Sequence, residues 1–177
     1  YVGDSAAVTV LRDGKMMNFD ISLTPHDRLV PVHIVGKPPS YYICAGIVFT
    51  VVCVPYLRSE YGKDYDYDAP LRLLSKMMHG HKEKPDDQVV VVSQVLNSDI
   101  NIGYEDIVNV VVCGVNGKPV RNLRELVKIV EGCKHEYLKI ELDQSKQIVL
   151  ETKAAKKSTK EILHTHCIPN ASSVDLR

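Results

Sequence analysis

The sequence predicts an α+β fold, in which a small, partly open antiparallel β-barrel is closed at its ends by two or three helices. Three observations lead to this class. Several short apolar runs lie between turn signals, as expected for strands. One amphipathic segment, residues 123–130, has helix signals at both ends. Two further short strands on either side of residues 143–146 complete the pattern as a closing hairpin.

The segment Tyr1–Leu23 predicts a separate β-hairpin. Apolar and polar residues alternate on both sides of Asp13-Gly14, a dipeptide that tolerates the positive φ of a tight turn. The apolar members are Val8, Val10, Phe19, Ile21 and Leu23. Because two strands alone are marginal in water, we expect residues 1–24 either to end a truncated preceding domain or to pack on the rest of the chain. The proline-rich residues 25–38 are typical of a linker.

Residues 39–152 are expected to form the main domain. Tyr41–Pro55 is the most apolar stretch and predicts one buried strand, entered through Ala45-Gly46. Pro70 should open a short helix between two polar loops, Tyr61–Asp68 and His79–Asp87. The later elements are strands at Gln88–Leu96 and Val108–Val115, a tight turn at Asn116-Gly117, and a hairpin of Tyr137–Leu142 with Gln147–Glu151.

The clearest predicted helix begins after Asn122. Asn122 is a favoured N-cap residue, and Glu125 three positions later completes a capping box in the broader sense. Gly132 stands where a left-handed residue commonly ends a helix. One apolar face has the spacing i, i+3, i+4, i+7 through Leu123, Leu126, Val127 and Val130. A last helix, Thr152–His166, is expected within a C-terminal segment of residues 153–177.

The composition argues against two kinds of partner. Lys plus Arg and Asp plus Glu both number 22, so the basic excess typical of nucleic-acid binders is missing. No apolar run approaches the roughly 20 residues of a membrane span. Five cysteines without a Cys-x-x-Cys pair favour free thiols in a reducing compartment. We therefore expect neither nucleic acid nor membrane as a partner.

Catalytic and metal-binding patterns are weak. No serine lies in a Gly-x-Ser-x-Gly or Gly-Asn-Ser-Gly setting, which an exposed nucleophile beside an oxyanion hole commonly has. Cys133 with His135 is one alternative, a thiol enzyme; zinc at His164, His166 and Cys167, completed by the distant His79-x-His81 pair, is another. The more economical interpretation is surface residues, and we expect no catalytic residue, metal or cofactor. A lysine stripe on the last helix, Lys153, Lys156, Lys157 and Lys160, is interpreted as a solvated face.

A binding role fits the strand that comes after Gly46. A sheet edge beside a helix can accept an extended peptide as an added strand. Free N–H groups of a glycine-containing loop before that strand can hold a carboxylate. Residues 42–54 have this layout, and the helix of residues 123–130 would form the other wall.

Longer stretches resemble a known family. VVVCGVNGKPV at Val110–Val120, followed by NLRELVKIVEG and YLKIEL, resembles the second half of an HtrA-type PDZ domain. Three more stretches resemble the second PDZ domain and tail of plant Deg (Do-like) serine proteases. They are PSYYICAGIVFT at Pro39–Thr50, VVVSQVLNSDINIGYEDI at Val90–Ile107 and HCIPNASSVDL at His166–Leu176. The insert YLRSEYGKDYDYDAP at Tyr56–Pro70 is most similar to the nuclear member of that group. GDSAAVTVLRDGK in the first hairpin resembles the end of the preceding, first PDZ domain.

This resemblance implies a non-catalytic, peptide-binding and assembly region of an oligomeric serine endopeptidase that acts in proteolysis and protein quality control. The triad would lie upstream. Partners would be C-terminal or extended peptides of protein substrates and neighbouring protease subunits of a homo-oligomer. An intracellular, nuclear (nucleolar) location is favoured, with the chloroplast and the mitochondrion as alternatives.

The same resemblance assigns the binding residues. By the family pattern, Gly46, Ile47, Val48 and Phe49 match the carboxylate-binding loop, and Thr50, Val51 and Val52 match the ligand-pairing strand. Val127 and Val130 are expected to face the groove, with Leu126 toward the core. Ile47-Val48 is bulkier than the usual loop. A purely structural oligomerisation scaffold with an occupied groove therefore stands as the alternative to free peptide capture.

Overall fold

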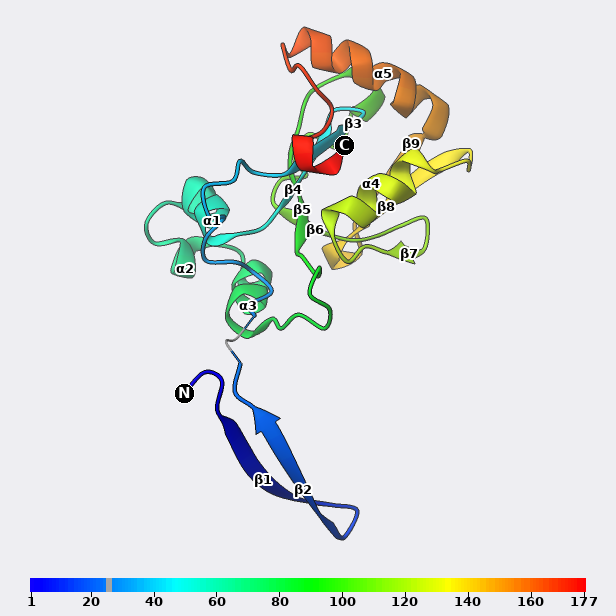
Figure 1. The fold of residues 1–177 in the computed structure, drawn as a ribbon. Helices are drawn as coiled ribbons and strands as arrows, with labels where there is room; N and C mark the ends of the chain where they lie inside the picture. Colours follow the sequence, from blue (N-terminus) through cyan, green and yellow to red (C-terminus); the bar gives the residue numbers. More distant parts are fainter. Residues whose placement is uncertain (25–26) are drawn as a thin grey trace.

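The computed structural model describes residues 1–24 and 27–177. Pro25 and His26, the first residues of the predicted linker, lie outside the described residues. The chain forms a two-stranded hairpin and a larger α+β unit built on a seven-stranded sheet. Figure 1 shows the hairpin extending away from the larger unit, whose helices lie on both sides of the sheet.

The N-terminal hairpin forms as predicted. β1 (Ser5–Arg12) pairs with β2 (Lys15–Ser22) in an unbroken antiparallel register. Asp13 (φ 51°) and Gly14 (φ 74°) both adopt the left-handed backbone that a two-residue turn needs. Val8 lies opposite Phe19, yet both side chains are exposed. In the described residues, the hairpin therefore keeps an apolar face in contact with solvent.

The predicted strand Tyr41–Pro55 is two strands and the start of a helix, so that prediction is wrong. β3 (Tyr41–Cys44) turns back at once into β4 (Ile47–Val51). The reason is Ala45-Gly46, where both residues have positive φ (51° and 83°) and make a hairpin turn. A Cβ added to Gly46 would collide with the Leu96 carbonyl oxygen, so only glycine fits this turn.

Three short helices come after β4 and cover one face of the sheet: α1 (Val54–Tyr61), α2 (Tyr65–Asp68) and α3 (Leu71–His79). The helix after Pro70 is confirmed, but α2 lies inside what was expected to be a polar loop. Leu57 and Leu73 are fully buried against Val91 of the sheet, which gives this region a core of its own. Burial on one side therefore accounts for α1 and α3. The short α2 buries no side chain fully and is closed by backbone hydrogen bonds to the Asp64 carbonyl.

Four of the remaining strands agree with the predicted ones to within two residues at each end. They are β5 (Val90–Val95), β6 (Val110–Val115), β8 (Tyr137–Leu142) and β9 (Gln147–Glu151). The two-residue strand β7 (Lys118–Pro119) was not predicted. The sheet order is β3-β4-β5-β6-β8-β9, with β7 added beside β6. Single-turn 3₁₀ helices lie at Asp99–Asn101, Asp143–Ser145 and Val174–Leu176.

The α+β class and the antiparallel sheet are confirmed. The end strands of the path, β3 and β9, do not pair with each other in the described part of the chain, so the sheet stays open rather than closing into a barrel. With α4 (Leu123–Glu131) and α5 (Thr152–Thr165), the described residues contain five α-helices where two or three were predicted. The additional ones are α1 and α2, which precede the predicted helix α3.

The helix α4 begins as predicted and ends differently. Asn122 Oδ1 accepts a hydrogen bond from the Glu125 N–H at 2.8 Å, which satisfies one N-terminal donor. Glu125 Oε2 accepts from the Arg121 N–H at 3.0 Å instead of closing the box on Asn122 itself. Gly132 has φ −78° and ψ −3°, so the predicted left-handed end is wrong. The backbone stays in the right-handed region there because the Cys133 N–H donates a hydrogen bond to the Val130 carbonyl, which extends the helix by one tight turn.

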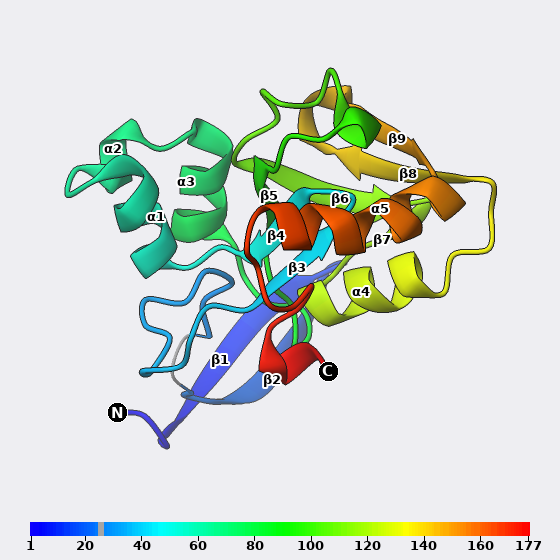
Figure 2. The same ribbon diagram turned by 90° about the horizontal axis from the view of Figure 1, so that it is seen from above.

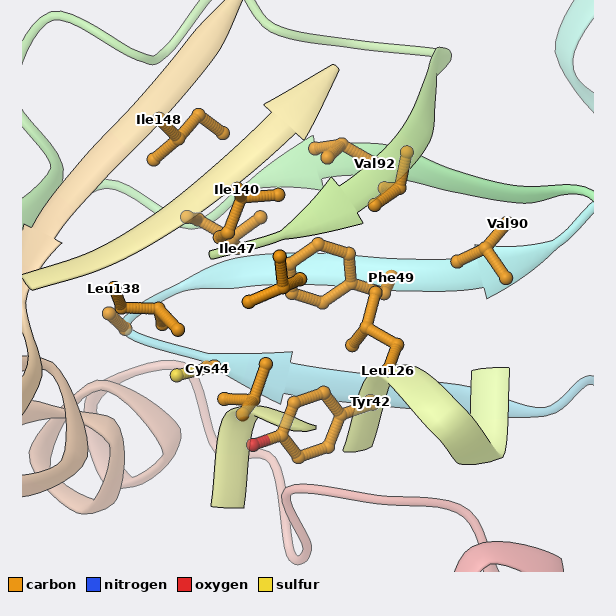
Figure 3. Packing of buried hydrophobic residues seen from close by; sticks show 14 of the residues in the cluster. Tyr42, Cys44, Ile47, Phe49, Val90, Val92, Leu126, Leu138, Ile140 and Ile148 are labelled. Carbon is orange, nitrogen blue, oxygen red and sulfur yellow. The ribbon is translucent and has the colours of Figure 1, made fainter. Parts of the chain in front are cut away.

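The main core lies between the other face of the sheet and the helices α4 and α5. Phe49 from β4, Leu126 from α4 and Ile140 from β8 are all fully buried there. Figure 3 shows these side chains converging, with Tyr42 of β3 beside Phe49. The sheet thus has a core on each face, and β4 contributes to the main core and leads directly into the other at Val52.

The two phenylalanines of the chain provide a test of this core. Phe49 is 0% exposed in the main core, whereas Phe19 is 42% exposed on the hairpin. Phe49→Ala should lower the free energy of unfolding by about 3–5 kcal/mol, because it removes a buried ring and leaves a cavity. Phe19→Ala should cost less than about 1 kcal/mol. Urea denaturation of both variants measures the difference, and equal losses would contradict this arrangement of the core.

Candidate peptide-binding groove

The predicted groove lies where β4 faces α4. Gly46 stands in the turn before β4, and Ile47, Val48, Phe49, Thr50 and Val51 form the strand itself, with Val52 directly after it. Ile47 and Phe49 are 0% exposed and belong to the main core beneath α4. The segment expected to contact a ligand is thus largely interior.

The two predicted helix residues separate. Val130 is 1% exposed and lies in the core together with Leu126, while Val127 is half-buried at its margin. The spacing places residues i and i+4 on one helix face, which accounts for Leu126 and Val130 lying together. Of the two, Val127 is the one with surface to offer a ligand; the roles of both as peptide contacts remain predictions.

Both edges of β4 are already paired within this chain. On one side Thr50 lies opposite Val91 and Phe49 opposite Val92 of β5. On the other side Thr50 lies opposite Tyr41 of β3, and the register runs through to Cys44 opposite Ile47. β3 is antiparallel to β4, and its C-terminal end lies at the Gly46 turn. β3 therefore occupies the place that an incoming peptide would take beside this strand.

Tyr42 fixes β3 in that place. Its ring stacks on Phe49 with 6.1 Å between centroids, and its hydroxyl donates to Glu131 Oε1 at 2.6 Å near the end of α4. Burial and the neighbouring Cys44 and Glu131 raise the pKa of Tyr42 above its usual value, so the phenol stays protonated as a donor. Burial likewise raises the pKa of the Cys44 thiol to about 11. The Tyr42–Glu131 hydrogen bond therefore links β3 directly to α4.

Three backbone groups of the Gly46 turn, the N–H and carbonyl of Ala45 and the carbonyl of Gly46, also have partners within the chain. The Ala45 N–H donates to Thr159 Oγ1 of α5 at 2.8 Å. Asn101 Nδ2 donates to the carbonyl oxygens of Ala45 and Leu96, both at 2.8 Å. The Gly46 carbonyl accepts from the Leu96 N–H at 2.7 Å. The donor that would hold a carboxylate at Ala45 is thus committed to α5.

Sequence reasoning did not single out Tyr42, Asn101 or Thr159. Tyr42 carried a local signal, since it is a ring with a hydroxyl that comes directly before an apolar run and a turn. Asn101 is 0% exposed but lies in a polar loop, where its burial has no local signature. Thr159 is one of several polar residues of α5, and only the packing of α5 over β3, visible in Figure 2, brings it to the turn.

A charged clamp holds the start of α4. Arg121 donates to both oxygens of Asp87, from Nε to Oδ1 and from Nη2 to Oδ2, each at 2.9 Å. Asp87 Oδ2 also accepts from the N–H groups of Glu83 and Lys84 at 2.9 Å. The Arg121 guanidinium and these N–H groups hold the pKa of Asp87 well below its usual range. This clamp ties the loop before β5 to the helix wall.

The alternative catalytic and metal residues lie apart from the groove. Cys133 Sγ accepts a hydrogen bond from Asn116 Nδ2 at 3.3 Å, and Cys167 is exposed after α5. Within residues 1–24 and 27–177, no three His, Cys, Asp or Glu side chains gather as metal ligands would. In the same part of the chain, no helix combines the length and apolar character needed to cross a membrane.

The fold agrees with a match to a family. Residues 30–175 match the family described as PDZ domain, so the chain belongs to the PDZ domain family. The match covers both cores, α5 and most of the C-terminal segment. The hairpin β1–β2 lies outside it.

Curated relatives extend the comparison. The chain is 36% identical over 176 residues to "Protease Do-like 2, chloroplastic" and 39% identical over 174 residues to "Putative protease Do-like 3, mitochondrial", both of Arabidopsis thaliana. It is 38% identical over 172 residues to "Protease Do-like 4, mitochondrial" of the same plant. These alignments cover 97–99% of this chain and 28–30% of the relatives. The chain therefore spans less than a third of the length of the proteases that it matches.

These names support the Do-like protease resemblance and bear on the compartment. They place the three relatives in the chloroplast or the mitochondrion. The expected similarity to the nuclear member, based on the insert at Tyr56–Pro70, receives no support from them.

The clamp on α4 predicts an acid-sensitive stability. The pKa of Asp87 is lower in the folded chain than the unfolded value near 3.9, so its contribution is complete above that value and is lost as the pH falls through the folded pKa. Asp87→Asn should therefore be less stable than the wild type at pH 6, and the difference should shrink at pH 2. Urea denaturation across this range measures both effects.

Asn122→Ala is the matched control at the same end of α4. It removes the cap without removing the Asp87 carboxylate, so it should lower stability by about 1 kcal/mol with little dependence on pH. An Asp87→Asn profile that ran parallel to the wild type down to pH 2 would contradict the role of the clamp.

Proposed function

We propose that this chain is the second PDZ domain and tail of a Do-like serine protease, and that it serves assembly and positioning rather than the capture of free C-terminal peptides. The observation that carries the proposal is the pairing of both edges of β4, with β3 in the ligand's position. Tyr42 holds β3 there through Phe49 and Glu131. An incoming peptide would have to displace a strand that is part of the main core.

The first hairpin fits the end of a preceding domain. β1 and β2 expose an apolar face that includes Val8, Phe19 and Ile21. A two-stranded hairpin with such a face needs a packing surface to be stable. We assign residues 1–24 to the end of a preceding PDZ domain, 25–38 to the linker, 39–152 to this domain and 153–177 to its C-terminal helix and tail.

The parent protein would supply the chemistry. The relatives are named as proteases, and this chain aligns with less than a third of each of them. We place the catalytic triad outside these residues and expect no proteolysis from the chain itself. Neighbouring subunits of a homo-oligomer are its proposed partners, and the chloroplast or the mitochondrion is its proposed location.

One cavity favours limited peptide capture as a second candidate. A cavity of about 640 Å³ lies at the start of β3 and the end of β4, between Pro39 and Tyr56. Thr50 and Val51 line it, and both belong to the predicted ligand-pairing strand. The end of a peptide could enter there without displacing β3. This would keep part of the predicted site while the rest stays occupied.

A titration distinguishes the two candidates. The ¹⁵N-labelled chain is mixed with a pool of extended peptides that end in an apolar residue. If β3 fills the groove, the amides of Gly46 and Phe49 should not shift, because their surroundings do not change. Shifts confined to Val51 would favour the cavity candidate.

Two variants make the result decisive. Val127→Arg places a charge on the half-buried wall of the groove, and Lys157→Ala alters an exposed position on α5. Shifts of Gly46 and Phe49 that disappear in Val127→Arg and persist in Lys157→Ala would overturn the occupied groove and restore peptide capture as the function.

A further inference from the structure

The outer edge of β3 is covered by the C-terminal segment of the chain. The Ile43 N–H donates to the Ala171 carbonyl at 2.7 Å, and the Ser173 N–H donates to the Tyr41 carbonyl at 3.0 Å. Tyr42 and Ser172 lie opposite each other as an antiparallel bridge. Residues 171–173 therefore act as one more antiparallel strand at the end of the sheet. In Figure 2 this segment passes beside β3 and ends near α4.

The side chains of residues 173–176 make the contact selective. Ser173 is 6% exposed, and its Oγ accepts from the Tyr41 N–H at 3.1 Å. Asp175 Oδ2 accepts from Ser40 Oγ at 2.7 Å, and the Asp175 carbonyl accepts from Arg124 Nη2 at 2.9 Å. Leu176 packs against the main core at the start of α4. The recognised pattern is a small residue, an acidic residue and an aliphatic residue along an extended segment.

This segment is held more weakly than the strand beneath it. After Ile162 of α5, no apolar side chain of the described chain is fully buried. Within the segment, Leu176 is only partly buried and Val174 is 79% exposed. Beside Leu176 and Arg124 a cavity of about 170 Å³ is left at the start of α4. Segments with few buried apolar contacts open locally at a small fraction of the global free energy of unfolding.

Release of the segment would leave a receptive edge. The N–H of Ile43 and the carbonyl oxygen of Tyr41 would then face solvent on a strand that β4 and Tyr42 keep in place. Unpaired strand edges are templates for a further strand. Because the same sequence in another copy would make identical contacts, exchange between copies costs little beyond association itself.

We propose that the outer edge of β3 is a second docking site, distinct from the groove between β4 and α4, and that it takes residues 171–176 of a second copy of this chain. In a single copy the site is closed in cis by the same residues. The proposal rests on the contacts of β3 and would also stand if the end of a peptide entered the cavity lined by Thr50 and Val51, because that candidate leaves β3 in place.

A peptide test uses the full chain. Ser173→Asp with Leu176→Asp should release the segment, because it places a carboxylate beside the Tyr41 carbonyl and another in the apolar contact of Leu176. The probe is a fluorescein-labelled peptide of residues 168–177. It should bind this double variant at least about tenfold more tightly than the wild type, in the micromolar range typical of short extended peptides. Fluorescence anisotropy measures both affinities.

Two controls accompany that measurement. Val174→Asp adds the same residue type at the exposed position of the segment, so the segment should stay docked and the affinity should equal that of the wild type. A peptide carrying the two aspartates should not bind. A double variant with wild-type circular dichroism that binds the probe no better than the wild type would overturn the proposal.

A second measurement uses only the wild-type chain and so does not depend on a variant that folds. In the wild-type chain, amide hydrogen exchange at Ile43 and Ser173 should be at least about tenfold faster than at Phe49, because the segment opens without global unfolding. Equal exchange at all three amides would show a fixed segment and overturn the proposal.

The choice of a second copy as the occupant has its own test. Sedimentation velocity of the wild type should show dimers that increase with concentration, and the double variant should lose them while Val174→Asp keeps them. A wild type that stays monomeric at millimolar concentration would overturn the second copy as the occupant.

Discussion

The pairing of β3 with β4 is the contact on which the rest of this structure depends. It is made possible by two consecutive positive-φ residues, Ala45 and Gly46, and by the absence of a Cβ at Gly46. Once β3 folds back, Tyr42 reaches Phe49 and the end of α4. The same strand then presents its outer edge to residues 171–173. One tight turn thus sets the inner strand, the helix wall and the docking of the C-terminal segment.

The second organising feature is a sheet with a core on each face. β4 contributes Phe49 to the core beneath α4 and leads, through Val52, into the core beneath α1 and α3. A strand buried on both faces shows a continuous apolar run rather than alternation, and residues 47–54 are apolar apart from Thr50. Binding at β4 is therefore coupled to the packing of the whole domain. The outer edge of β3 is less constrained, because a polar segment with one partly buried leucine covers it.

Much of the fold could be predicted from local signals. The turns at Asp13-Gly14 and Asn116-Gly117, the cap at Asn122 and the closing hairpin each carry their information within a few residues. The failures have different causes. The apolar run of Tyr41–Pro55 conceals the turn at Ala45-Gly46, where the Leu96 carbonyl oxygen leaves room only for glycine. The single turn of α2 and the end of α4 at Gly132 are decided by short-range backbone hydrogen bonds that the residue types alone do not reveal.

By itself, the sequence determined the α+β class, the antiparallel strands, the helix α4 and the resemblance to PDZ domains of Do-like proteases, because periodicity, turn residues and family motifs are local properties of the chain. The tertiary structure alone decided what lies in the groove. Tyr42 meets Glu131 across 89 positions, Ala45 meets Thr159 across 114, and Tyr41 meets Ser173 across 132. No local pattern encodes which of these partners occupies the edge of a strand, since every backbone offers the same N–H and carbonyl groups.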